Sequence, residues 1–114
     1  LAAKLKPYLD QLGGLIQQAA ADLRSDKQPV LLTNASCFLN VFSSCVVSWI
    51  WLRQANVAEQ ALANGADEQD ADFYEGKLAA AEYFLNWELP LVSRDIEVLS
   101  SREATCNNVK ASYF

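Results

Sequence analysis

The longest apolar segment of the chain lies within residues 27–53, where no charged residue separates Lys27 from Arg53. Its central part, Val30–Leu52, would form a helix roughly 35 Å long at about 1.5 Å per residue. Pro29 suits the first turn of such a helix, and the Asn64-Gly65 pair is typical of a helix stop. The pattern therefore predicts one central helix of roughly 35 residues, well above the usual mean of about 11.

A stripe of small polar residues decides whether this helix lies in protein or in lipid. The stripe recurs at steps of three and four and consists of Thr33, Ser36, Asn40, Ser44 and Ser48. On a helix these positions lie along one narrow line, for which a lipid-facing helix has little use. They also make the segment less apolar than a typical membrane-spanning helix. The pattern therefore favours a soluble, buried helix over a membrane span, with the stripe as a close contact for another helix.

The N-terminal segment has the repeat of an amphipathic helix. Its apolar positions are Leu5, Leu9, Leu12, Ile16, Ala19, Ala20 and Leu23. Pro7 is tolerated only in a first turn, so the helix is expected either to start near Pro7 or to be kinked there. Gly13 and Gly14 are unfavourable in a helix interior. We interpret this glycine pair as a sign that another backbone approaches closely.

A third helical segment follows an acidic turn at residues 66–70, where Asp67 or Asp70 is a candidate N-cap. The positions of this segment at helical spacing are Phe73, Leu78, Ala81, Phe84 or Leu85, Glu88 or Leu89, Val92, Ile96 and Leu99. Pro90 lies in the middle and removes one helical hydrogen bond. The sequence therefore predicts a kinked helix, or two collinear pieces divided just before Pro90.

Together these patterns predict an all-α fold of one domain, residues 1–114. The architecture expected is an antiparallel bundle of three long helices, the third bent at Pro90, similar to a four-helix bundle. The last stretch, residues 101–114, has no helical periodicity. We expect it to be an ordered or partly ordered tail that Tyr113 and Phe114 pin to the bundle.

Composition restricts the partners. The net charge of −5 and a pI near 4.5 argue against nucleic acid, whose phosphates need a basic face. Hydrophobic residues make up 52% of the chain, which is much for a domain with a small interior. Part of the apolar surface is therefore expected to face a neighbouring domain or subunit, so that the chain works within a homo-oligomer or a larger protein.

Residue types that carry chemistry are scarce. The chain has no histidine, which removes the commonest general base and metal ligand. Glu82 and Glu88 are six residues apart and so lie on different helix faces, which favours solvated or salt-bridged roles over catalysis. Trp49, Trp51 and Trp87 would suit a ligand pocket, but aromatic residues at helical spacing are more often core or interface. We predict no catalytic, cofactor-binding or metal-binding residue in this chain.

The cysteines indicate a reducing compartment. Cys37 and Cys45 lie about 12 Å apart along one helix, too far to pair with each other, and Cys106 makes the number odd. The spacing contains no CxxC motif, which disfavours zinc. The expected state is three reduced thiols in the cytoplasm.

The third segment, FYEGKLAAAEYFLNWELPLVSRDIEVL, resembles the C-terminal helical domain at the end of the long form of bacterial acyl-CoA dehydrogenases. The features that carry the resemblance are Lys77, the small residues Ala79–Ala81, the aromatic pair Tyr83 and Phe84, and the Leu89-Pro90 pair. The two preceding helices fit the same pattern, so the resemblance covers nearly the whole chain. The chain departs from the family at Trp87-Glu88, where apolar or basic residues are commoner, and at the cysteines of the central helix.

The resemblance implies a role within a larger enzyme. Enzymes of that family use FAD to remove two hydrogens from an acyl-CoA thioester, and they pass the electrons to an electron-transfer flavoprotein. The flavin, the thioester pocket and the glutamate base belong to the dehydrogenase core that precedes this domain, so no catalytic residue is carried over. The chain starts with Leu and has no Met, which is expected of a piece of something longer.

Two functions from different classes follow. The first is an accessory and association domain of an FAD-dependent acyl-CoA dehydrogenase, inactive when alone. The alternative is an independent helical bundle that serves in interaction or regulation and forms a homodimer through its surplus apolar face.

Overall fold

The computed structural model describes residues 1–114 and contains only helices, joined by turns and short extended linkers. The α-helices are α1 (Ala2–Asp22), α2 (Gln28–Thr33), α3 (Ala35–Ala63), α4 (Glu68–Tyr83), α5 (Ser93–Ser100) and α6 (Thr105–Asn108). A π-helical turn, η1 (Phe84–Glu88), and two 3₁₀ turns, η2 (Leu89–Val92) and η3 (Ala111–Tyr113), complete the chain. The predicted all-α class is confirmed. The finer prediction, an antiparallel bundle of three long helices with the third bent at Pro90, is not confirmed, because the predicted second helix is divided into α2 and α3.

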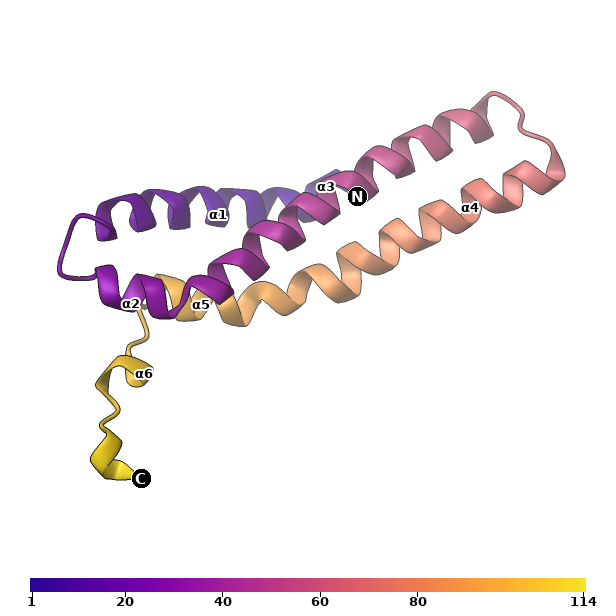
Figure 1. The fold of residues 1–114 in the computed structure, drawn as a ribbon. Coiled ribbons are helices and arrows are strands. Elements are labelled where there is room, and N and C mark those ends of the chain that lie inside the picture. The colour runs from indigo at the N-terminus through magenta and orange to yellow at the C-terminus, as the bar shows by residue number, and fades with distance from the viewer.

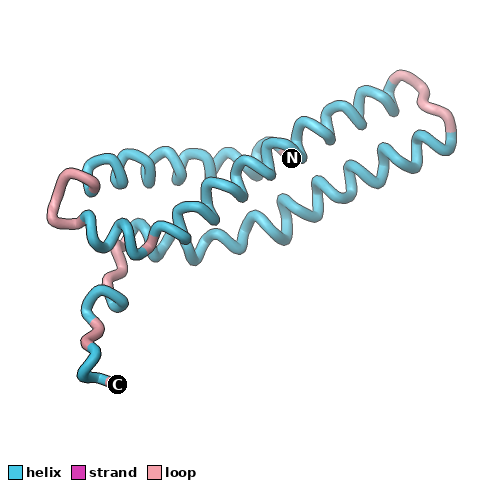
Figure 2. The backbone as a smooth tube through the Cα atoms, viewed as in Figure 1, coloured by secondary structure: helices cyan, strands magenta, loops and turns pink.

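The helices form an elongated rod with extents of 66 × 31 × 15 Å. In Figure 1, α1, α3 and α4 run in alternating directions, and the α3–α4 hairpin extends well past the start of α1. The tube in Figure 2 shows the loops gathered at the two ends of the rod. The radius of gyration is 19.1 Å, against about 13 Å for a compact domain of this length. The part of the α3–α4 hairpin that extends past the start of α1, hereafter the arm, consists of α3 and α4 alone.

The hydrophobic core lies at the other end of the rod, where α1, the first part of α3 and the η1–η2–α5 segment meet. It consists of Leu5, Leu12, Leu15, Val41, Cys45, Leu85, Leu89, Val92 and Leu99. Only 15 of 114 residues are buried, so this core is small for the length of the chain. In the arm, contact between α3 and α4 is made largely by small side chains, namely Ala55, Ala58 and Ala81, which are all buried.

The central helix is broken at Asn34, which the sequence pattern does not predict. The backbone of Asn34 has φ −94° and ψ 13°, and its carbonyl accepts from the amides of both Cys37 and Phe38. Its side-chain Nδ2 donates to the carbonyl of Glu103 at 2.9 Å. Because asparagine readily exchanges helical bonds for such side-chain bonds, α2 and α3 become separate helices at this residue.

The predicted stop and restart between α3 and α4 are confirmed. Gly65 has φ +79°, and its amide donates to the carbonyl of Leu62 at 3.2 Å. Of the two candidate caps, Asp67 is the one used, since its carboxylate accepts from the amide of Asp70 at 2.9 Å. The left-handed glycine and the acidic cap therefore define a short turn at the end of the arm.

Gly65 and Gly76 are expected to respond to alanine in opposite directions. A Cβ at either position would meet no atom within 4 Å, so only the backbone decides. Gly65→Ala should lower the free energy of unfolding by about 1–2 kcal/mol, because alanine is strained at positive φ. Gly76→Ala, inside α4, should raise it by about 0.5–1 kcal/mol. Urea titrations followed by circular dichroism measure both, and shifts of the same sign would contradict this account.

The interruption predicted before Pro90 is present as a change of helix type. The amide of Leu89 donates to the carbonyl of Phe84, five residues earlier, and Pro90 then occupies the start of the 3₁₀ turn η2. A proline has no amide hydrogen to continue the α-helical series. The π turn therefore accommodates Pro90 without ending the helical path from α4 to α5.

Two expectations about other positions in the helices are corrected. Pro7 lies inside α1, which begins at Ala2, so the alternative in which the helix starts at the proline is wrong, and the alternative of a kink at Pro7 stays a prediction. No atom lies within 4 Å of a Cβ built at Gly13 or Gly14, so the close backbone approach predicted there is wrong within this chain.

The predicted polar stripe winds around its helix. Steps of four residues advance by more than one full turn, so the stripe moves from exposed Ser36 to fully buried Ser48. The hydroxyl of Ser48 donates to the carbonyl of Ser44 at 2.7 Å. The stripe is therefore buried only at its C-terminal end.

The prediction that aromatic side chains pin the tail is wrong. Tyr113 is 65% exposed and Phe114 is 99% exposed. The tail instead contacts α2 through the Asn107 side chain, whose Nδ2 donates to Oγ1 of Thr33 at 3.0 Å. Figure 1 shows that beyond this contact the last residues project away from the rod.

Candidate functional site

The acidic side chains considered for catalysis do not form a reaction centre. Glu82 is exposed, and Glu88 accepts a hydrogen bond from the Tyr83 hydroxyl at 3.1 Å. That hydrogen bond to a carboxylate raises the pKa of Tyr83. No three side chains of the Asp, Glu, Cys or His types lie close enough together to hold a metal ion. Glu82 is thus solvated, whereas Glu88 takes part in a hydrogen bond and not in a predicted salt bridge.

The three cysteine thiols are free, and the pKa values of Cys37 and Cys45 are raised. Burial and a hydrogen bond to the Asp95 carboxylate raise the pKa of Cys37, and burial raises the pKa of Cys45. A raised pKa means less thiolate, which is the nucleophilic form. Cys106 is exposed on α6. Cys37 and Cys45 therefore act as small core side chains.

An ion pair joins the C-terminal end of α1 to the turn after α5, and we call it the clasp. Nε and Nη2 of Arg102 donate to the two carboxylate oxygens of Asp22 at 2.8 and 3.1 Å. Asp22 is only 5% exposed, and the bond to Arg102 lowers its pKa. Arg102 has φ +51°, and the amide of Glu103 donates to the carbonyl of Val98 behind it. The clasp is a structural element that closes the core end of the rod.

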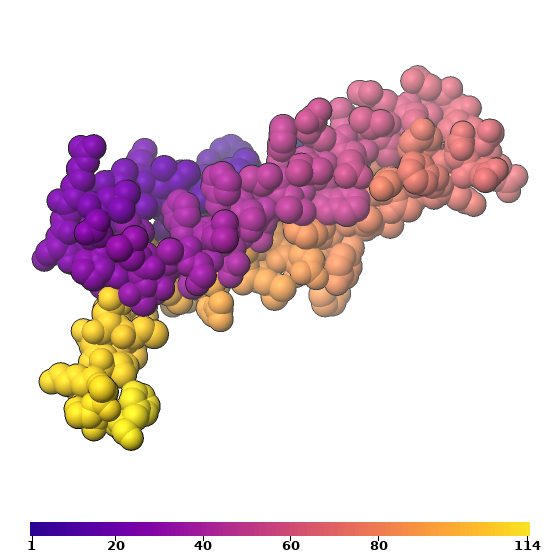
Figure 3. Space-filling model, in the orientation of Figure 1, coloured from indigo at the N-terminus to yellow at the C-terminus, as the bar shows by residue number.

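The clearest functional feature is a surplus of exposed surface, that is, more solvent-accessible area than a folded monomer of this mass normally has. The chain exposes 7701 Å², whereas a folded monomer of its mass exposes about 6,200 Å². The space-filling view in Figure 3 shows that the arm is narrow and that the C-terminal tail projects from the rod, and both add to the exposed surface. Surface of this extent is characteristic of a piece that packs against another protein body.

Much of the surplus lies on α3, which has two apolar faces. The inner face is buried and contains Val41, Cys45, Ser48, Ala55 and Ala58. The opposite face, hereafter the outer stripe, consists of Leu39, Phe42, Val46, Trp49, Ile50 and Val57, with Arg53 among them. Its apolar members are between 39% and 63% exposed. Sequence analysis missed the division into two faces, because a helix that is apolar all round has no preferred side.

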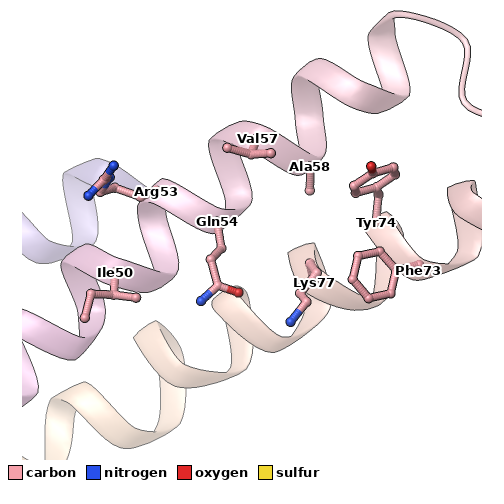
Figure 4. A pocket seen from close by; sticks show the side chains of 8 residues that line it. All are labelled: Ile50, Arg53, Gln54, Val57, Ala58, Phe73, Tyr74 and Lys77. Atoms are coloured by element: carbon pink, nitrogen blue, oxygen red, sulfur yellow. The ribbon is translucent and has the colours of Figure 1, made fainter.

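The outer stripe leads into a groove between α3 and α4 in the arm (Figure 4). The groove has a volume of about 380 Å³. It is lined by Ile50, Arg53, Gln54, Val57 and Ala58 of α3 and by Phe73, Tyr74 and Lys77 of α4. The Arg53 guanidinium lies 5.1 Å from the centre of the Trp49 ring, and Lys77 Nζ lies 5.4 Å from that of Phe73. Neither cation takes part in an ion pair within the chain.

The tryptophans do not belong to the core and do not gather into one pocket. Trp49 is 53% exposed on the outer stripe, and Trp51 lies under Lys77, with 5.8 Å between Nζ and the ring centre. Trp87 is 68% exposed and stacks on Tyr83 with ring centres 6.3 Å apart. Of the roles considered for them, exposure at these positions is consistent with an interface.

The helix α3 is also long and apolar enough to cross a membrane, judged by length and composition alone. Core helices of soluble proteins pass the same test. Only 17% of its most apolar window is buried in this chain. The helix is thus an apolar element without full cover.

A comparison with known protein families decides the relationship. The family model described as "Acetyl-CoA dehydrogenase C-terminal like" matches residues 1–110. The chain belongs to this family. The resemblance to acyl-CoA dehydrogenase C-terminal domains is confirmed, and in this member of the acetyl-CoA dehydrogenase C-terminal-like family Leu89 is a fully buried core residue.

One relative of this family member is an acyl-CoA dehydrogenase. A segment of 64 residues is 39% identical to the broad-specificity linear acyl-CoA dehydrogenase FadE5 of Mycobacterium tuberculosis strain H37Rv. The aligned segment makes up 56% of this chain and only 10% of that enzyme. The acetyl-CoA dehydrogenase C-terminal-like chain therefore corresponds to a small part of its relative.

Proposed function

We propose that this chain, residues 1–114 as one domain, is the C-terminal association module of a longer, FAD-dependent acyl-CoA dehydrogenase. The observation that carries the proposal is the family match over residues 1–110, together with a similar enzyme of which the aligned segment is only 10%. The surplus apolar surface supports the same role, because an accessory domain needs faces for a core and for neighbouring subunits.

In this proposal the reaction takes place outside the chain. The dehydrogenase core binds FAD and the acyl-CoA and passes electrons to an electron-transfer flavoprotein in the cytoplasm. The module contributes packing and assembly. Exposed side chains on η1, such as Trp87, which is 68% exposed, are available for contact with that core.

The residues of this chain do not fit a flavin dinucleotide. A pyrophosphate is usually bound at a helix N-terminus that follows a glycine-rich turn. The N-terminus of α4 is capped by the Asp67 carboxylate and carries Glu68 and Asp70 in its first turn, which would repel phosphate. The groove in the arm is an open surface depression between two helices. No step of the dehydrogenation is therefore assigned to these residues.

An independent homodimeric helical module is the second candidate function. The outer stripe favours it, since an unpaired apolar helix face is also what a self-associating protein presents. The gene distinguishes the two candidates, whereas self-association of the chain does not.

The reading frame upstream of the Leu1 codon tests the proposed function. We expect it to continue into a dehydrogenase core. An initiator codon directly before Leu1, preceded by a stop codon, would contradict the proposal. In the purified parent, deletion of residues 1–114 should leave the flavin absorption band in place and change the oligomeric mass. Loss of flavin without a change of mass would count against an association role.

A further inference from the structure

The outer stripe has the spacing of a helix-docking surface. Its members follow one another at steps of mostly three and four residues from Leu39 to Val57, which is the repeat by which two helices interlock along a seam. The stripe is about 27 Å long at 1.5 Å per residue, longer than a small ligand requires. Another helix of similar length therefore fits it best.

The area of the stripe is sufficient for a pair of identical chains. The exposed fractions of its apolar residues, 39–63%, correspond to roughly 600 Å² per chain for side chains of these sizes, or about 1,200 Å² for two. That total is at the lower end of standard interfaces, above the approximately 1,000 Å² that a specific interface needs. The stripe accounts for less than half of the surplus surface of the chain.

The charges at the two ends of the rod determine the orientation. Asp67, Glu68, Asp70 and Asp72 gather at the end of the arm, and we call them the acidic tip. The turn between α1 and α2, at the opposite end in Figure 1, has Arg24 and Lys27 with Asp26 between them, a net charge of +1. The two cations are exposed and form no ion pair. A parallel pair would place two acidic tips together, whereas an antiparallel pair places each tip near the partner's basic turn.

From these observations we infer that the outer stripe of α3 pairs with the outer stripe of a second copy of this chain, antiparallel, about a two-fold axis between Val46 and Ile50. Val46 then lies opposite Ile50 of the second copy, and Leu39 opposite its Val57. The inference deepens the association role proposed above and names its partner. It rests on that role but not on the identity of the parent enzyme.

The register is consistent with the positions of the charges. Helix α3 extends about 20 Å in both directions from the middle of the stripe. The acidic tip follows its C-terminal end, whereas α2 separates its N-terminal end from the basic turn by about 9 Å. The guanidinium of Arg53, held against Trp49 at 5.1 Å, would lie beside Phe42 of the second copy. A flat, weakly hydrated guanidinium is readily accommodated in such an interface.

Sedimentation equilibrium of the 114-residue chain tests the pairing. The wild-type chain should dimerise in a concentration-dependent manner. Val46→Glu should raise the dissociation constant at least about 100-fold, because each copy would then bury an unpaired carboxylate. Leu91→Glu is the matched control, since Leu91 is 69% exposed but lies on η2, and it should leave the constant within about threefold. Circular dichroism of each variant shows whether the fold is retained.

Disulfide trapping tests the orientation in a Cys106→Ser background. Leu39→Cys combined with Val57→Cys should cross-link two chains on mild oxidation, and Leu39→Cys alone should not. A charge reversal tests the ends: Arg24→Glu with Lys27→Glu should weaken the dimer, and addition of Glu68→Lys and Asp72→Lys should restore it.

Several results would overturn the inference. They are a wild-type chain that stays monomeric at all concentrations, a dimer that Leu91→Glu disrupts more than Val46→Glu, and efficient cross-linking by Leu39→Cys alone. Binding of the wild-type monomer to phosphatidylcholine vesicles would assign the stripe to lipid instead. The identity of the parent is tested separately by the upstream reading frame, so the two proposals can fail independently.

Discussion

Replacement of Leu89 by alanine is expected to destabilise the chain by about 2–5 kcal/mol, the usual range for a large aliphatic side chain removed from a core. Leu89 is 0% exposed and lies among nine buried apolar residues. Small domains have a total stability of roughly 5–15 kcal/mol, and this core is small. A substantial unfolded fraction should therefore be present even without denaturant.

Urea titration followed by helical circular dichroism measures the effect. Leu91→Ala is the matched control, because Leu91 is 69% exposed and two residues away. Its free energy of unfolding should change by no more than about 0.5 kcal/mol. Equal effects of the two substitutions would show that the core does not lie where η2 places it.

Disruption of the clasp is expected to lower the melting temperature and to make the melting temperature less dependent on pH in the acidic range. The pKa of Asp22 is lowered in the folded chain by its hydrogen bond to Arg102. A carboxyl group whose pKa is lowered by folding stabilises the fold above its unfolded pKa of about 3.9, and this contribution is lost as the pH falls through the folded value. Asp22→Asn should therefore melt at a lower temperature than wild type at neutral pH.

The pH profile separates the clasp from general destabilisation. As the pH is lowered through about 4, the melting temperatures of wild type and Asp22→Asn should converge. Asp10→Asn is the control, because Asp10 pairs with Lys6 on the surface, where the two side chains are 67% and 74% exposed and such pairs contribute little. A constant difference between wild type and Asp22→Asn at every pH would contradict the assigned linkage.

Two substitutions at Arg102 separate the effect of its strained backbone on stability from the effect of losing its side-chain charge. Arg102 adopts φ +51°, which glycine adopts without strain and alanine does not. Both Arg102→Gly and Arg102→Ala lose the bonds to Asp22. The alanine variant should melt at the lower temperature, and its difference from the glycine variant reports the strain in the turn.

The ends of the helices could be predicted from the sequence because single residues determine them. Gly65 stops α3, Asp67 caps α4, and Pro90 forces a change of helix type, each through its own backbone or side chain. The break at Asn34 could not be predicted, because it depends on a hydrogen bond to Glu103, a residue far along the chain. The same holds for the clasp, which joins Asp22 to a residue 80 positions away.

The site was harder to predict than the fold. Composition indicated that part of the apolar surface faces another protein body, but the periodicity of α3 did not show which face. That choice depends on which side α1 and α4 cover, and α1 is too short to reach the arm (Figure 1). The aromatic tail was assigned to the bundle on hydrophobicity alone, although Phe114 has no partner near it and is 99% exposed.

The two-helix arm also divides the rod into regions of unequal resistance to opening. Amide protons near the nine-residue core are expected to exchange with solvent only when the whole fold opens, whereas those near the acidic tip have one neighbouring helix to protect them and should exchange faster. The free chain is therefore expected to open more readily at the arm than at the core end. An association that covers α3 would increase the protection of amide protons in the arm more than in the core, so that assembly would stabilise the part of the chain that opens most readily.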